Sequence, residues 1–100
     1  MTKQIHSMAE LRRILFPIFI QYDIKKAIIF GSYGKSQATE KSDVDLLVDS
    51  GLKGLRFIGM SEDMRNALDK EVDVLDVMHI ESESKIDREI KDTGVLLYEK

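Results

Sequence analysis

Residues 31–48 read GSYGKSQATEKSDVDLLV, and this stretch carries most of the information about the fold and the chemistry of the chain. It begins as a loop rich in Gly, Ser, Thr and Lys and ends in an apolar run, residues 44–48, that is typical of a buried strand. A second apolar run, residues 27–30, comes directly before it. We therefore predict two strands joined by a loop, with polar side chains at both ends of that loop.

Helices and strands are predicted to alternate on both sides of this stretch. Ser7 and Glu10 have the spacing of a capping box, and apolar residues at helical spacing follow as far as Tyr22. Pro17 lies inside this pattern, so we expect a kink or a break there. The elements expected downstream are a helix over residues 55–70, a strand over 72–77, a helix begun by Ser82 or Ser84 and ended by Gly94, and a strand over 95–98. The order α-β-(loop)-β-α-β-α-β indicates an α/β (α+β) fold with one central sheet, in a single domain over residues 1–100.

Composition narrows the class of protein. The 100 residues are 43 % apolar and 33 % charged, a balance that supports a buried core under a charged surface. A formal net charge of −3 argues against strong nucleic-acid binding, which needs a cationic surface. The chain has no cysteine, which excludes disulfides, thiolate zinc sites and cysteine nucleophiles. We see no signal peptide and no membrane-spanning stretch, so we expect a soluble, cytoplasmic protein.

Two aspartates at the start of the second strand suggest a metal site. Asp43 and Asp45 are two residues apart, so on a strand their side chains point to the same face. Ionised carboxylates held that close repel one another unless a cation lies between them, and all-oxygen ligands suit Mg²⁺. The pair does not begin an EF-hand, because Val48 stands where that loop needs glycine.

The glycine–serine pair at the start of the loop suggests a phosphate site. Gly31 allows a ligand to approach the backbone closely, and Ser32 can present its N–H and hydroxyl to an anion. Lys35 can add a mobile positive charge, although it is also a plausible solvated loop residue. Together with the carboxylates, these residues predict a site for a nucleotide triphosphate.

A third carboxylate is expected from the strand over residues 72–77. Asp73 lies inside this apolar run, where a carboxylate costs several kcal/mol, on the order of 2–7, unless it is paired or bound to a metal. It would complete a two-metal site. Strand alternation places Asp76 on the opposite face, so either aspartate can be the ligand, and we favour Asp73.

The combination of Gly31-Ser32, ten intervening residues, Asp43-x-Asp45 and the later Asp73 resembles the nucleotidyltransferase superfamily that includes DNA polymerase beta. The short chain is similar to the minimal nucleotidyltransferase branch. The resemblance implies a single mixed sheet flanked by helices, with phosphates bound at the glycine–serine pair and two Mg²⁺ ions held by the three aspartates. The chain departs from the family at residues 34–36, where Gly-Lys-Ser follows the tyrosine in place of Ala-Arg-Gly. A lysine keeps the charge but loses the bidentate fork of arginine.

The same resemblance implies a function. Members of this branch resemble antitoxins that accompany HEPN (higher eukaryote and prokaryote nucleotide-binding) toxins, and some transfer AMP from ATP to a tyrosine of that partner. We therefore expect a Mg²⁺-dependent protein adenylyltransferase whose acceptor site is completed by a HEPN protein or a second copy. One alternative is a catalytically weak subunit that blocks a HEPN partner by contact. Another is transfer to a small molecule, as in aminoglycoside nucleotidyltransferases, which carry an extra domain.

Overall fold

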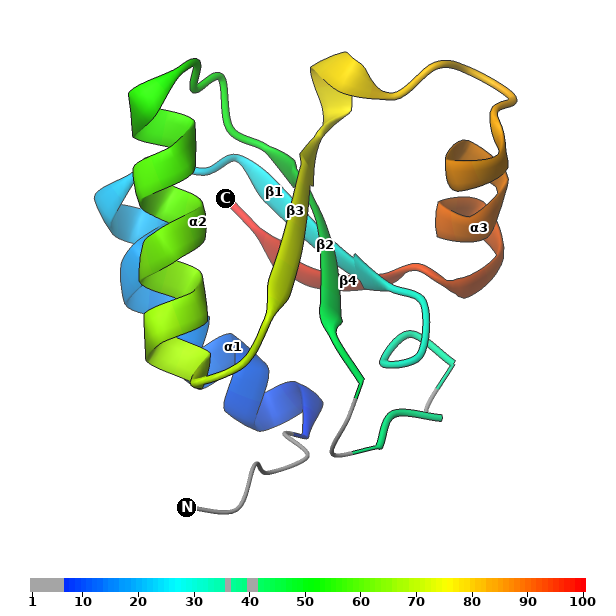
Figure 1. The fold of residues 1–100 in the computed structure, drawn as a ribbon, viewed down its shortest axis with the longest axis horizontal. Helices are drawn as coiled ribbons and strands as arrows, with labels where there is room; N and C mark the ends of the chain where they lie inside the picture. Colours follow the sequence, from blue (N-terminus) through cyan, green and yellow to red (C-terminus); the bar gives the residue numbers. More distant parts are fainter. Residues whose placement is uncertain (1–6, 36, 40–41) are drawn as a thin grey trace.

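The computed structural model of the protein describes residues 7–35, 37–39 and 42–100. Its helices and strands follow the predicted order, with one short 3₁₀ turn, η1, that the sequence did not predict (Figure 1). The elements are α1 (Met8–Gln21), β1 (Lys26–Phe30), β2 (Val44–Asp49), α2 (Leu55–Leu68), β3 (Val72–Asp76), η1 (Val77–His79), α3 (Lys85–Thr93) and β4 (Val95–Glu99).

The four strands form one mixed sheet in the order β3-β2-β1-β4. β1 is antiparallel to both β2 and β4, whereas β2 and β3 are parallel. Helices α1 and α2 cover one face of the sheet, and α3 lies over the other (Figure 1). This arrangement confirms the predicted single mixed sheet flanked by helices.

Alternation along β2 divides its side chains between the two faces. Val44, Leu46 and Val48 are fully buried in the main core beneath α1 and α2. Leu47 instead packs in a smaller apolar cluster with Phe30 and with residues of α3. Because Asp45 alternates with its buried neighbours, it shares the α3 face with Leu47.

Helix α1 begins where the sequence predicts but runs through its proline. The Ser7 hydroxyl accepts from the Glu10 N–H at 3.1 Å, and the Glu10 carboxylate accepts from the Ser7 N–H at the same distance. The helix continues without a break past Pro17, so a break at that residue is a wrong prediction. Because proline has no N–H, the Arg13 carbonyl four residues earlier loses its helical hydrogen-bond donor. Pro17 and Arg13 are both exposed, so water can bind this carbonyl instead.

Local backbone geometry sets several boundaries more sharply than the sequence pattern did. Helix α2 ends at Leu68 because Asp69 adopts a left-handed conformation, with φ of 51°. Ser84, and not Ser82, caps α3 by accepting from the Asp87 N–H, and Gly94 ends that helix as predicted. Within the described part of the chain, no helix combines the length and the apolar character needed to cross a bilayer.

Candidate functional site

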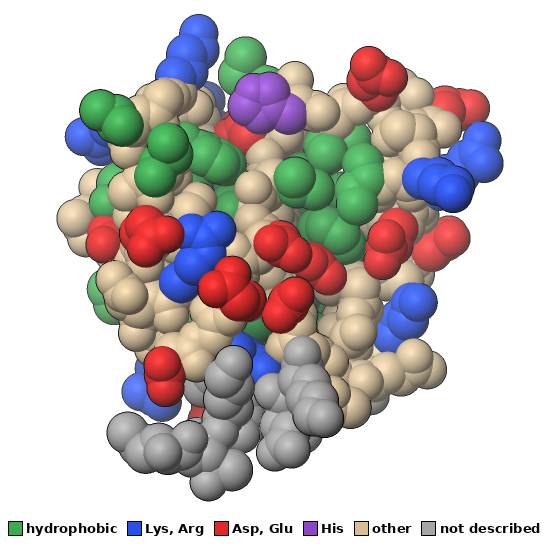
Figure 2. Space-filling view, in the orientation of Figure 1, with side chains coloured by type: hydrophobic (Ala, Val, Ile, Leu, Met, Phe, Trp, Pro, Cys, Tyr) green, Lys and Arg blue, Asp and Glu red, His purple; other side chains and the backbone are tan. Residues whose placement is uncertain are grey.

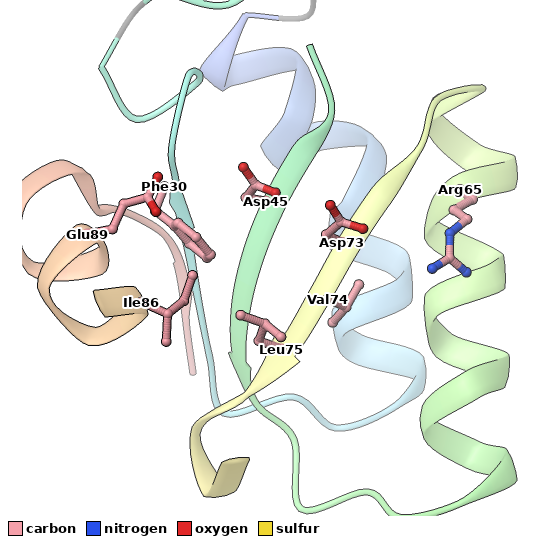
Figure 3. Close-up of a pocket in the computed structure, with 8 residues that line it drawn as sticks. All are labelled: Phe30, Asp45, Arg65, Asp73, Val74, Leu75, Ile86 and Glu89. Atoms are coloured by element: carbon pink, nitrogen blue, oxygen red, sulfur yellow. The ribbon is translucent and has the colours of Figure 1, made fainter. Parts of the chain in front are cut away.

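A hollow of about 420 Å³ opens on the face of the sheet that α3 covers (Figure 3). Its described lining combines carboxylates with an apolar floor: Phe30, Asp45, Arg65, Asp73, Val74, Leu75, Ile86 and Glu89. Figure 2 shows acidic side chains gathered at the centre of this side of the molecule, next to apolar ones. The hollow therefore presents carboxylate side chains next to an apolar surface.

Asp45 occupies the centre of the site because its strand is paired on both sides. It lies opposite Phe30 of β1 and opposite Asp73 of β3. Figure 3 shows the Asp45 and Asp73 carboxylates next to each other on neighbouring strands, with Glu89 reaching in from α3. The parallel register of β2 with β3 thus brings together two carboxylates that are 28 residues apart in sequence (45 and 73).

The Asp45 carboxyl titrates far from its ordinary range. Burial, and then the charges of Asp73, Glu89 and Asp43, raise its pKa from 3.8 to about 6, and a hydrogen bond with Asp73 acts in the same direction. Each of these influences disfavours the ionised form. An ionised Asp45 is therefore disfavoured first by its burial and then by the negative charges around it.

Asp43 differs in position from the other two predicted ligands. It lies just before β2, is exposed, and is absent from the described lining of the hollow. Its charge nevertheless contributes to the raised pKa of Asp45. Asp43 therefore lies outside the described lining of the hollow, although its charge acts on Asp45.

Asp76 belongs to a different environment, so the structure separates it from Asp73. Its side chain is 1 % exposed and accepts from the N–H and the hydroxyl of Ser50 and from the N–H of Met78. Burial alone would raise the pKa of Asp76, but these hydrogen bonds outweigh it and lower the pKa. Asp76 fixes the start of η1, whereas Asp73 projects into the hollow.

The glycine–serine turn follows β1 and lies against the carboxylates. Gly31 has φ of +71°, and a Cβ built on it would lie 2.6 Å from Asp45 Oδ2 and 3.7 Å from Glu89 Oε1. The two oxygens are therefore at most 6.3 Å apart, the sum of these distances. A single helical turn follows, closed by a bond from the Lys35 N–H to the Gly31 carbonyl at 3.0 Å, and both Ser32 and Lys35 are exposed. Ser36, predicted to belong to this loop, lies outside the described residues.

Glu89 is a residue of the hollow that the sequence reasoning missed. It lies on α3, three residues after Ile86 and directly before Ile90. Both isoleucines pack in the apolar cluster on this face of the sheet. That spacing was a usable signal, because a glutamate at i+3 from a partly buried isoleucine lies on or beside the packed face. What the sequence could not reveal was that α3 packs on the face of the sheet that carries Asp45.

The chemistry of this donor set fits a divalent cation. Arg65 is the one basic residue in the described lining, and it forms ion pairs with Glu62 at 2.8 Å and Glu71 at 3.7 Å. In the part of the chain that the structure describes, Asp45, Asp73 and Glu89 therefore share the hollow without an ion pair to Arg65 or to another basic side chain. Among the described residues, no three acidic or histidine side chains are already arranged to hold an ion. The carboxylates can hold Mg²⁺ only together with other ligands such as water or phosphate oxygens, which is how this ion is usually bound.

Comparison with known families identifies the kind of protein that this site belongs to. The family described as "Polymerase beta, Nucleotidyltransferase" matches residues 15–100. The chain belongs to this nucleotidyltransferase family. The match includes the glycine–serine turn and all of the aspartates discussed above, so the predicted resemblance is confirmed.

Two relatives of this nucleotidyltransferase come from the archaeon Methanocaldococcus jannaschii. The candidate protein adenylyltransferase MJ0435 is 38 % identical over 68 residues, which cover 66 % of this chain and 73 % of the relative. The candidate protein adenylyltransferase MJ0126 is 33 % identical over 57 residues, covering 55 % and 58 %. Both relatives share the broad transferase class of the family.

Solved structures share the fold at low sequence identity. A crystal structure of a toxin–antitoxin with AMP-PNP has a TM-score of 0.75 at 18 % identity, covering 89 % of this chain and 73 % of that one. The structure of a tri-AMPylated Shewanella oneidensis HEPN toxin in complex with MNT antitoxin has a TM-score of 0.71 at 16 % identity, covering 93 % and 73 %. A nucleotidyltransferase candidate from Sulfolobus solfataricus has a TM-score of 0.55 at 23 % identity, covering 93 % and 81 %. These likenesses show the architecture of the nucleotidyltransferase fold in this chain.

Proposed function

We propose that this nucleotidyltransferase is a Mg²⁺-dependent protein adenylyltransferase that transfers AMP from ATP to a hydroxyl group of a HEPN-domain partner. The observation that carries the proposal is the pairing of Asp45 with Asp73 directly beside the Gly31 turn. A triphosphate held at that turn would place its phosphates against both carboxylates. Family membership supplies the reaction class, and the geometry supports a site for it.

The carboxylates would hold the metal ions. Asp45 and Asp73 are the first candidates because both line the hollow, and Asp43 is near enough to join them with exposed oxygens. Bound Mg²⁺ would activate the acceptor oxygen and neutralise charge on the departing pyrophosphate. The raised pKa of Asp45, caused by burial first and by its acidic neighbours second, supports this assignment, since a cation would stabilise the ionised carboxylate against both.

The nucleotide would be held at the turn after β1. Gly31 and Ser32 would bind the outer phosphates, and Lys35 would add a positive charge from the same turn. The choice of ATP is supported by the adenylyltransferase relatives and by the neighbour structure with AMP-PNP. In the transfer, the acceptor oxygen bonds to the α-phosphorus and the bond to the bridging oxygen breaks. Pyrophosphate leaves, and the hydroxyl proton passes to a carboxylate, for which Asp73 is the candidate.

A HEPN partner is proposed on the likeness to MNT antitoxin bound to a HEPN toxin. The shape of the site is in keeping with an acceptor brought by another protein, because the hollow is open and its floor is apolar. Leu75 and Ile86, which are partly exposed, offer a surface on which an apolar side chain that carries a hydroxyl can rest beside the carboxylates.

Label transfer from ATP tests this function. With α-labelled ATP, Mg²⁺ and a purified HEPN-domain protein from the same organism, we expect label on the HEPN protein and loss of transfer on addition of EDTA. Asp73→Asn should reduce transfer at least about a hundredfold, whereas Asp92→Asn, on the exposed side of α3, should leave it within about twofold. Equal labelling by the wild type and Asp73→Asn would contradict the proposed site.

A binding subunit with weak catalysis is the second candidate. The observation in its favour is that no metal-holding group of three side chains is preassembled among the described residues. The two functions separate when Asp45→Asn is assayed for both label transfer and neutralisation of the toxin. Loss of both activities supports the enzyme, and loss of transfer with full neutralisation supports the binding subunit.

A further inference from the structure

The last turn of α3 is joined to the glycine–serine turn through the side chain of Thr93. The Gly31 N–H donates to Thr93 Oγ1 at 3.0 Å, and this hydroxyl donates to the Glu89 carbonyl at 2.7 Å. A threonine that bonds only to the carbonyl four residues back is common in helices. Here the same oxygen also accepts from a backbone 62 residues away, so the hydroxyl links two segments.

The backbone of Thr93 makes a second contact with the same turn. A methyl group at Gly34 would overlap the Thr93 carbonyl oxygen and would lie 3.0 Å from Phe30 Cα. Gly34 does not have a positive φ, so glycine is needed there for close approach and not for its backbone conformation. The turn is thus held at Gly31 by a hydrogen bond and at Gly34 by close packing.

These contacts fix the part of the turn that faces the carboxylates. Gly31 is buried and its Cα faces Asp45, so its peptide orientation decides how close the backbone of the turn comes to that carboxylate. Ser32 is the next residue, and its N–H direction follows from the same peptide. Without the Thr93 hydroxyl, a buried N–H would have to turn towards water to find an acceptor.

Building on the proposed function, we propose that Thr93 is a positioning residue of the nucleotide site. Its hydroxyl orients the Gly31–Ser32 turn so that the turn can receive the phosphates beside Asp45 and Asp73. Thr93 itself does not contact the nucleotide in this proposal. It acts through Gly31, and α3 therefore supports the phosphate side of the site as well as contributing Glu89 to its wall.

Two substitutions at Thr93 distinguish the effect of its hydroxyl group from the effect of its side-chain shape. Thr93→Val keeps the branched shape and removes both hydrogen bonds, whereas Thr93→Ser keeps the hydroxyl. By calorimetry with ATP and Mg²⁺, we expect Thr93→Val to weaken binding about tenfold and Thr93→Ser to stay within about twofold of the wild type. In label transfer, Thr93→Val should raise the KM for ATP more than it lowers kcat.

Ser84→Ala is the matched control for a merely structural effect. Ser84 caps the other end of α3, so this substitution weakens the helix without touching the turn. Wild-type ATP affinity in Ser84→Ala, with reduced affinity in Thr93→Val, supports positioning. Equal losses in the two variants, or wild-type affinity in Thr93→Val, would overturn it.

Amide hydrogen exchange at Gly31 gives a readout that does not depend on the nucleotide. Its protection should fall in Thr93→Val and persist in Thr93→Ser, measured by NMR on the chain without ligand. Unchanged protection in Thr93→Val would show that the hydroxyl does not hold the turn. If the wild type itself binds no ATP in the presence of Mg²⁺, the proposed function fails, while the exchange data still decide whether Thr93 fixes the turn.

Discussion

Asp45 and Asp73 stand directly opposite each other in the parallel pairing of β2 with β3, and both line the hollow under α3. Side chains at matched positions of neighbouring strands point to the same face. Two carboxylates in this relationship repel each other and make the sheet less stable when both are ionised. A proton on one carboxylate, or a cation bound between the two, relieves this repulsion.

Stability should therefore depend on pH through Asp45. Its folded-state pKa of about 6 lies above the ordinary 3.8, so between these values the folded chain binds more protons than the unfolded chain. The free energy of unfolding should fall as pH rises through this window, and the contribution of Asp45 should be lost above about pH 6. Thermal melts of the wild type should show this fall, and Asp45→Asn should show a smaller one. An identical pH dependence in both proteins would contradict the assignment.

Glu89 should influence the titration of Asp45. It is the second charge, after Asp73, that raises the pKa of Asp45, so Glu89→Gln should move that pKa back towards 3.8. A carbon-detected NMR titration of the side-chain carboxyl groups measures the shift. Asp92→Asn removes a charge from the same helix at an exposed position and serves as the control. A shift of the same size in both variants would mean that Glu89 has no specific role at the site.

Truncation of the two aspartates of β3 should affect different properties, stability for Asp76 and label transfer for Asp73. Asp76→Ala leaves the buried N–H of Ser50 without its acceptor, and should cost about 2–3 kcal/mol of unfolding free energy in urea. Asp73→Ala removes a source of repulsion from the hollow and should change stability by less than about 0.5 kcal/mol. Label transfer should be lost in Asp73→Ala. A larger loss of stability in Asp73→Ala than in Asp76→Ala would reverse the roles given to these residues.

Gly31→Ala should disturb the site through steric overlap, in addition to the free-energy cost of a left-handed backbone conformation. Gly31 and Gly51 both have positive φ, 71° and 68°, but only at Gly31 would the new methyl group meet other atoms, namely those of Asp45 and Glu89. The left-handed conformation alone should cost each alanine variant about 1–2 kcal/mol. Gly31→Ala should be the less stable variant and should lose ATP binding, while Gly51→Ala keeps it. Equal ATP affinities would show that the turn tolerates a side chain beside the carboxylates.

The sequence predicted much of this fold because its strands are short, apolar and clearly bounded. Alternation placed Asp73 and Asp76 on opposite faces, but it could not decide which face α3 covers, so both stayed open as ligands. The exposed position of Asp43 shows a limit of the same rule. Alternation orders side chains only within a strand, and Asp43 lies one residue before β2 begins.

Glu89 and Thr93 were not predicted because their roles depend on tertiary packing. Nothing near Thr93 in sequence indicates that its hydroxyl meets a backbone N–H at the end of β1. The parallel pairing of β2 with β3 was also not read from the sequence, and it is this pairing that brings Asp45 to Asp73. Both residues that the sequence did not reveal, Glu89 and Thr93, thus lie on α3 and meet the rest of the site only through the folding of the chain.

The bond between Gly31 and Thr93 joins two residues that are 62 positions apart in the chain. A ribosome will have released the glycine–serine turn and every aspartate of the site well before it releases Thr93. The nascent chain therefore holds the turn and the aspartates proposed to bind ATP while it still lacks the Thr93 hydroxyl that holds the turn. Competence to bind ATP, under the proposed function, should arise only after α3 has left the exit tunnel.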